Sequence, residues 1–232
     1  MKFWNWQEQD GEMPELMLNG PIDSDTWWGD EVTPGMFREE LSLRKGKKVK
    51  VLINSPGGDL FAACEIYTML KNHAAGVEVE IQSLAASAAS VVAMAGNPVK
   101  ISPAGMVMIH NPLTGVYGNE HDFAQSIAAL KEAKQSIINA YRTKTNLSEE
   151  ELSAMMDREE WMNAKKAKEL GFVDEILFKE EEEPKMQAMC WSHKEYTNRV
   201  AACIEEMERR KENEAERERM IRVKLDLRKG GR

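Results

Sequence analysis

Cysteine is scarce in this chain of 232 residues, which contains three. Cys64, Cys190 and Cys203 show no CxxC spacing and have no neighbouring cluster of histidines. The pattern therefore predicts neither a disulfide framework nor a metal site of the zinc type. A reducing compartment, the cytoplasm, is the expected location.

Long apolar runs and a surplus of basic charge are also missing. No run reaches the ~20 apolar residues that span a bilayer, and residues 1–12 turn acidic too early to resemble a secretory signal. Lys and Arg number 31 against 39 Asp and Glu, whereas proteins that bind nucleic acids concentrate basic residues against the phosphates. We therefore expect a soluble protein that binds neither membranes nor nucleic acid. Walker-type phosphate loops are absent too, so any use of ATP is expected to belong to a partner.

Residues 15–178 alternate short β-like runs with helical patterns, which is typical of an α/β domain. Strands are expected at residues 15–20, 48–54, 77–83, 106–110 and 172–178. Helices are expected at residues 34–43, 60–72, 84–96, 120–145, 148–156 and 163–170. The segment 84–96 is small and apolar on all sides, which predicts a buried helix. The segment 120–145 carries the longest helical pattern.

The composition changes abruptly on both sides of this domain. Four parts are predicted: an N-terminal segment (1–14), the α/β domain (15–178), a charged linker (179–185) and a charged C-terminal extension (186–232). The extension is rich in Arg, Lys and Glu and has Val200, Ile204 and Met207 at helical spacing. It is therefore expected to be mainly helical and solvated, with an oligomer as the place where it would pack.

Three short segments carry the groups that acyl transfer requires: a nucleophile, a base and donors for an oxyanion. The SPGG turn at residues 55–58 allows backbone N–H groups to approach a substrate closely. Ser87 lies between alanines at a strand-to-helix transition, where the Ala88 N–H can join an oxyanion hole. His110 ends an apolar strand, so its imidazole emerges where the chain leaves the sheet. Alone, the glycine turn is commoner as a bare turn and the serine as a helix cap, whereas a structural histidine is about as common as a catalytic one.

Other serines and histidines compete for these roles. Ser83 and Ser90 are alternative nucleophiles, but Ser90 lies almost one turn further on and is expected to face a different neighbour. His73, His121 and His193 occur in polar, helical or tail settings and are expected at the surface.

The three segments in combination closely resemble the Clp peptidase family. The matching motifs are INSPGG (53–58), LAASAAS (84–90) and MIHNP (108–112), in this order. The resemblance covers residues 15–178 and implies a serine peptidase without a cofactor, in which Ser87 is the nucleophile and His110 the general base. It also implies that Gly58 and Ala88 donate their N–H groups to the oxyanion.

The resemblance further implies an architecture and an assembly. The expected fold is a crotonase-like spiral of repeated ββα units, with the long helix after His110 as a handle. Homo-oligomeric rings of six or seven subunits, single or doubled, would enclose the active sites and admit polypeptide substrates.

The acidic member of the triad is expected within the segment DREEWMNAKKAKELGFVD, residues 157–174. In the family an aspartate precedes an aromatic residue here, and counting back from Gly171 places Glu159 at that position. Glutamate can orient an imidazole as aspartate does, although its extra methylene demands a different approach. Asp157 is the alternative acid, and Trp161 is expected to pack in the core.

Two features depart from housekeeping Clp subunits: the N-terminal segment and the extension after Phe178. Together with WWGDEVTP (27–34), the motifs look more like the Clp-related head maturation proteases of tailed phages and prophages. The expected substrate is then a capsid or scaffold protein. Three alternatives remain open: a housekeeping Clp subunit fed by an ATP-dependent unfoldase, an inactive assembly scaffold, and a crotonase-type enzyme acting on acyl-CoA. The Ser–His pair argues against the last of these.

Overall fold

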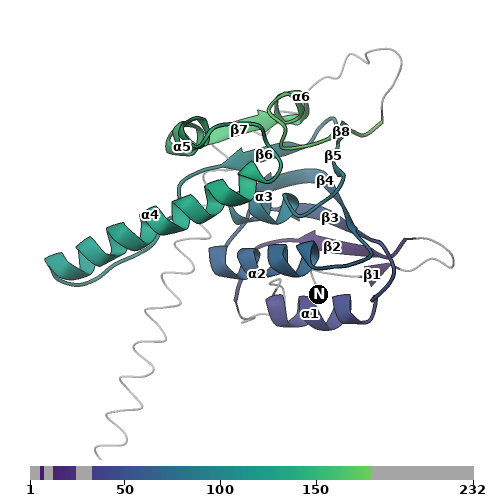
Figure 1. Ribbon diagram of the computed structural model, residues 1–232, viewed down its shortest axis with the longest axis horizontal. Helices are drawn as coiled ribbons and strands as arrows, with labels where there is room; N and C mark the ends of the chain where they lie inside the picture. The colour runs from purple at the N-terminus through teal and green to yellow at the C-terminus, as the bar shows by residue number, and fades with distance from the viewer. Residues whose placement is uncertain (1–5, 8–12, 25–32, 179–232) are drawn as a thin grey trace, which may run out of the picture. The chain divides into compact units, whose positions relative to one another are not determined.

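The computed structural model describes residues 6–7, 13–24 and 33–178 (Figure 1). Most of the predicted N-terminal segment, and all of the predicted linker (179–185) and predicted C-terminal extension (186–232), lie outside these described residues. The described part confirms the expected α/β class, because a mostly parallel sheet is packed against helices.

Eight strands and six helices make up the described part. The strands are β1 (Trp6–Gln7), β2 (Glu15–Asn19), β3 (Val49–Ser55), β4 (Val77–Ala86), β5 (Val99–Ile101), β6 (Met106–Ile109), β7 (Glu160–Asn163) and β8 (Glu175–Ile176). The helices are α1 (Pro34–Ser42), α2 (Leu60–Lys71), α3 (Ala88–Ala93), α4 (Glu120–Arg142), α5 (Glu149–Asp157) and α6 (Ala164–Glu169).

The sheet runs in the order β1-β2-β3-β4-β5-β8, and β6 joins it by pairing with both β4 and β7. The β1/β2 and β6/β7 pairs are antiparallel, and the other pairs are parallel. Strand β4 has two partners on the same side: residues 79–81 pair with β5, and residues 84–86 pair with β6. The end of β4 is therefore held between β3 and β6.

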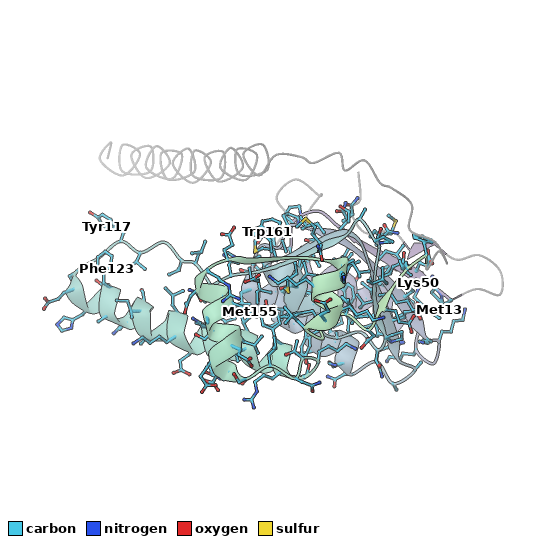
Figure 2. All side chains as sticks on the ribbon, turned by 90° about the horizontal axis from the view of Figure 1, so that it is seen from above. Met13, Lys50, Tyr117, Phe123, Met155 and Trp161 are labelled. Carbon is cyan, nitrogen blue, oxygen red and sulfur yellow. The ribbon has the colours of Figure 1, made fainter. Side chains whose placement is uncertain are left out.

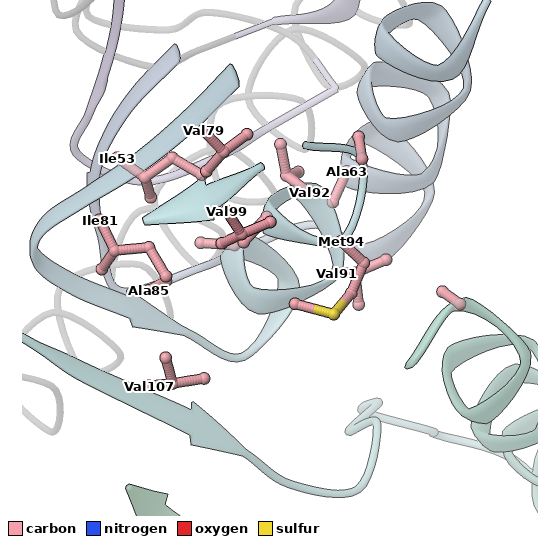
Figure 3. Close-up of a cluster of buried hydrophobic side chains, with 14 of the residues drawn as sticks. Ile53, Ala63, Val79, Ile81, Ala85, Val91, Val92, Met94, Val99 and Val107 are labelled. Carbon is pink, nitrogen blue, oxygen red and sulfur yellow. The ribbon is translucent and has the colours of Figure 1, made fainter. Parts of the chain in front are cut away.

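Helices cover the apolar sheet and close the core. Contacts link α1 to α2, α2 to α3, and α3 to α4, and Figure 1 shows α4 extending well beyond the sheet. Figure 3 shows Ile53 of β3, Val79 and Ile81 of β4, and Val91 and Val92 of α3 in one buried cluster. The run of residues 51–53 in β3 is apolar and buried, as expected for a strand that is covered on both faces.

The predicted helix at 84–96 is wrong in its first part. Residues 84–86 belong to β4, and the helix α3 begins only at Ala88. Alanine favours helices, but pairing with residues 106–108 of β6 satisfies the backbone of this segment and overrides that preference.

The predicted strand at 172–178 is shorter in the structure, where only β8 forms. Strands β5 and β7 were not predicted, because three or four residues are too few to show a period.

Among the helices that the structure describes, none is long and apolar enough to cross a membrane.

We predict that Ile53→Ala lowers the free energy of unfolding by about 2–5 kcal/mol, because it leaves a cavity in the centre of the sheet. Ile53 has no exposed surface, whereas Leu43 is 77% exposed and makes a suitable control. Leu43→Ala is expected to change the free energy by less than about 0.5 kcal/mol. Urea denaturation followed by circular dichroism measures both, and equal losses in the two variants would contradict this account of the core.

Candidate active site

Ser87 occupies the single residue between β4 and α3 and has a strained backbone. Its φ of 54° and ψ of -127° are rare for a residue other than glycine, and such conformations cost about 1–3 kcal/mol. Two backbone–backbone bonds hold it there: the Ser87 N–H donates to the Met108 carbonyl at 2.9 Å, and the Ser90 N–H donates to the Ser87 carbonyl at 3.0 Å. A sharp strand-to-helix turn of this kind exposes the side chain at its tip, as in the nucleophile elbow of hydrolases.

Strand pairing brings His110 to this turn. Ala86 is the partner of Met108 in the parallel β4/β6 pair, so the chain leaves both strands at neighbouring points. The Ser87 Oγ lies 2.6 Å from the His110 Nε2. With a neutral imidazole that carries its hydrogen on Nδ1, the serine hydroxyl donates to Nε2. The two side chains, which are 23 positions apart in the sequence, thus form the contact between nucleophile and base that acyl transfer needs.

The unpredicted strand β7 brings Glu159 towards His110. In the antiparallel β6/β7 pair Ile109 is opposite Glu160, so the next position on each strand places His110 near Glu159. Glu159 has a φ of 53°, and the Trp161 Nε1–H donates to its Oε1 at 3.0 Å. Trp161, which was expected to pack in the core, is half-buried and holds this carboxylate.

Asp157 makes different contacts. Its Oδ1 accepts from the Asn111 Nδ2 at 2.8 Å and from the Lys134 Nζ at 2.6 Å. These bonds, first that from Lys134 and then that from Asn111, hold the pKa of Asp157 below its usual value. Asp157 therefore ties α5 to α4 and to the segment after β6, and of the two candidate acids Glu159 is the one whose charge acts on His110.

The environment keeps the His110 imidazole neutral near pH 7. Burial lowers its pKa below the usual 6.5, and the negative charge of Glu159 opposes this by raising it. Burial is the larger effect, because it penalises the charged imidazolium. A neutral imidazole has a lone pair on Nε2 and can accept a proton, which suits a general base.

Glycine is required where the SPGG turn packs against Ser87. Gly57 has a φ of 95°, and a Cβ added there would lie 2.7 Å from the Ser87 Cβ and 2.8 Å from the Ala88 nitrogen. Any side chain at residue 57 would therefore push the turn away from the strand-to-helix junction. The backbone of the turn and the Ser87 side chain consequently form one surface.

Gly58 is held by Ile22 on its other side. The Ile22 N–H donates to the Gly57 carbonyl at 2.9 Å, and the Asp59 N–H donates to the Ile22 carbonyl at 2.8 Å. In a parallel bridge of this form the N–H of the central residue, Gly58, points to the opposite side. On that side of β3 lies β4, which leads to Ser87. The Ala88 N–H is the first of α3, where N–H groups have no partner inside the helix.

The competing serines and histidines have other surroundings. Ser83 is exposed on β4, and Ser90 is buried with its hydroxyl on the Ser87 carbonyl and the Tyr141 hydroxyl. His73 is half-buried and its Nε2 donates to the Lys47 carbonyl at 2.7 Å.

His121 is exposed, and His193 lies outside the described residues. Within the described ranges, no three His, Cys, Asp or Glu side chains gather as a metal site.

Sequence reasoning missed Tyr141 and the role of Trp161 towards Glu159. The helical period placed Tyr141 on the apolar side of α4, but a period does not show where its hydroxyl goes. A general rule does predict that both side chains form hydrogen bonds, because buried Tyr and Trp usually find a hydrogen-bond partner.

We predict that NMR titration of the His110 imidazole gives a pKa below 6.5 and that Glu159→Gln lowers it further. The substitution removes the negative charge that stabilises the imidazolium, so the shift is downward. Asp157→Asn is the matched control and is expected to change the pKa less, because Lys134 compensates the Asp157 charge. A larger shift for Asp157→Asn than for Glu159→Gln would identify Asp157 as the acid.

Comparison with known proteins gives a consistent result. The Clp protease family profile matches residues 17–180. An ATP-dependent Clp protease proteolytic subunit of Bacteroides fragilis is 33% identical over 156 residues, which cover 65% of this chain and 75% of the relative.

Two further relatives show similar agreement. The subunit of the same name from Porphyromonas gingivalis is 33% identical over 159 residues, covering 65% of this chain and 70% of the relative. The ATP-dependent Clp protease proteolytic subunit 1 of Chlamydia abortus is 31% identical over 137 residues, covering 57% and 71%. The family profile spans more than half of the sequence, and the chain therefore belongs to the Clp protease family of serine peptidases.

Proposed function

We propose that the chain is an endopeptidase that hydrolyses peptide bonds with Ser87 as nucleophile, His110 as general base and Glu159 as the acid of the triad. The observation that carries the proposal is the 2.6 Å contact between the Ser87 Oγ and the His110 Nε2. The strained backbone of Ser87 supports it, because strain of this kind is concentrated at functional sites.

The chemistry follows from these positions. The Ser87 Oγ attacks the carbonyl carbon of the scissile peptide while its proton passes to the His110 Nε2. The Glu159 carboxylate stabilises the imidazolium that forms. The N–H groups of Gly58 and Ala88 donate to the negative oxygen of the tetrahedral intermediate.

The intermediate then breaks down in two stages. The His110 imidazolium returns its proton to the leaving amine, which leaves an acyl group on the Ser87 Oγ. Water attacks this ester with His110 again as base, and the peptide acid is released.

Two of the alternative functions fit the site less well. Enolate stabilisation on an acyl-CoA needs paired N–H donors but no serine bonded to a histidine. An inactive scaffold would need neither that bond nor the strain at Ser87. The geometry of Ser87 and His110 therefore favours peptide hydrolysis over both.

The relatives favour a housekeeping-type role over head maturation. All three relatives described above carry the words ATP-dependent Clp protease proteolytic subunit in their names. We infer that this chain is likewise a proteolytic subunit in the cytoplasm that receives polypeptides from an ATP-dependent partner. The prophage interpretation, with capsid or scaffold protein as substrate, rests on the short motifs alone, and neither the family match nor these relatives add support to it.

The long helix α4 supports an assembly of several copies. Figure 2 shows Tyr117 and Phe123 at the outer end of α4, away from the sheet. Phe123 and Ile127 are one helical turn apart and are 50% and 55% exposed, and Leu113 in the preceding segment is 80% exposed. Exposed apolar groups of this kind mark interaction surfaces. We propose that α4 is the handle between copies in rings of six or seven subunits, single or doubled, with a core of repeated ββα units.

We predict that a fluorophosphonate probe labels the purified protein at Ser87. Ser87→Ala and His110→Ala are expected to abolish labelling and to lower peptide hydrolysis by about 10³-fold or more, because the two residues act as a unit. Ser83→Ala, which alters an exposed serine of β4, is the control and is expected to keep both labelling and peptide hydrolysis.

Mass spectrometry locates the adduct. Normal turnover by Ser87→Ala would refute the nucleophile assignment. Failure of a folded, assembled wild-type protein to react would favour the inactive scaffold.

We predict that Phe123→Asp combined with Ile127→Asp shifts the protein towards smaller species in sedimentation velocity. The added charges would be desolvated in any contact made by this side of α4. Gln125→Asp is the control, because residue 125 is exposed and lies on the opposite side of the helix. Unchanged circular dichroism would show that the double variant still folds, and an unchanged assembly would exclude this surface as the interface.

A further inference from the structure

A buried chain of hydroxyl groups connects α4 to the backbone of Ser87. Tyr141, near the end of α4, is 1% exposed, and its hydroxyl lies 2.8 Å from the Ser90 Oγ. The Ser90 Oγ in turn lies 2.5 Å from the Ser87 carbonyl oxygen, and Ser90 has no exposed surface. The Tyr141 ring is held edge-on against Phe172, with centroids 5.4 Å apart. The mechanism described above uses neither hydroxyl.

The direction of both hydrogen bonds follows from the groups involved. A carbonyl oxygen can only accept, so the one hydroxyl hydrogen of Ser90 must point at the Ser87 carbonyl. Ser90 then has only acceptor capacity left, and the Tyr141 O–H donates to it. Burial raises the pKa of Tyr141 far above its usual value, so this donor keeps its hydrogen at any working pH.

The target of this chain is the peptide plane that contains the Ala88 N–H. The Ser87 carbonyl and the Ala88 N–H belong to one planar trans peptide, in which they point in opposite directions. The carbonyl is held by two donors, the Ser90 hydroxyl and the Ser90 N–H. Fixing the carbonyl on the side of α3 therefore directs the Ala88 N–H in the opposite direction within the same plane, away from Ser90.

We propose that Ser90 and Tyr141 are positioning residues that lock the Ser87–Ala88 peptide plane and so aim the Ala88 N–H at the oxyanion. This inference rests on the proposed function, in which the oxyanion forms beside Ser87. Tyr141, at the buried end of α4, thereby helps to shape the oxyanion hole through Ser90.

If the two hydroxyls only stabilised the fold, removing both of them would leave the kcat of the folded enzyme unchanged. Replacing both partners of a buried hydrogen bond by apolar groups of the same shape can be nearly neutral for stability. The double variant Ser90→Val with Tyr141→Phe removes both hydroxyls, keeps the aromatic ring on Phe172 and leaves neither group without its partner. Threonine has nearly the shape of valine but keeps a hydroxyl. Ser90→Thr therefore controls for the larger side chain at residue 90.

We expect the double variant to fold and assemble with a kcat about tenfold to a hundredfold below wild type and a KM within about twofold. Deleting one oxyanion donor outright costs about 10²–10³ in kcat, and a misaimed donor should cost somewhat less. Ser90→Thr is expected to retain most of the wild-type kcat. Thr145→Val removes another buried hydroxyl, which donates to the Tyr141 carbonyl at 3.1 Å, and should leave kcat unchanged.

Crystal structures of the double variant and of Ser90→Thr provide a readout that is independent of activity. We expect the Ser87–Ala88 peptide plane to rotate in the double variant and to stay in place in Ser90→Thr. An unchanged plane together with a wild-type kcat in the double variant would overturn the inference while leaving Ser87 as the nucleophile. Failure of the wild-type protein to react with a fluorophosphonate would instead overturn the proposed function, and the crystal structures would still decide whether the hydroxyls hold the plane.

Discussion

The pairing of the last residues of β4 with β6 is the constraint on which the site depends. Ala85 has Ser55 of β3 on one side and Val107 of β6 on the other, so three chain segments end close together. The SPGG turn continues β3, Ser87 continues β4, and His110 continues β6. Because ligand sites of parallel sheets lie at the carboxyl ends of the strands, the pairings of β4 with β3 and with β6 assemble nucleophile, base and glycine turn without any contribution from a long loop.

Strain and close packing around Ser87 support one another. A serine with a φ of 54° needs a surrounding structure that holds it, and here the Met108 carbonyl, the Ser90 N–H and the Ser90 hydroxyl do so. Gly57 allows the neighbouring turn to approach within a distance that no side chain would permit. The small residues of α3 serve the same purpose, because alanine lets this short helix lie buried against its neighbours.

Particular residues show how far the sequence could be interpreted. The periods of α2 and α4 and the apolar run of β3 predicted these elements to within a few residues, because each is long enough to show a pattern. The segment 84–86 was mistaken for helix, since its alanines favour a helix locally and only its pairing with β6 makes it a strand. Strand β7 escaped prediction because its four residues are too few to show a period, so the strand pairing that brings Glu159 towards His110 was not foreseen.

Residue types and motifs were enough to predict the α/β class, the order of the three motifs, the candidate residues Ser87 and His110, and a membership in the Clp protease family that comparison then established. These properties depend on residue types and spacings along the chain. The folded chain was needed to show that the two side chains lie 2.6 Å apart and that Lys134 and Asn111 donate to Asp157. It was also needed to show that Tyr141 reaches the backbone of Ser87 through Ser90. Such contacts join residues from separate strands and helices, and their distances follow from sheet register and packing, which no local pattern encodes.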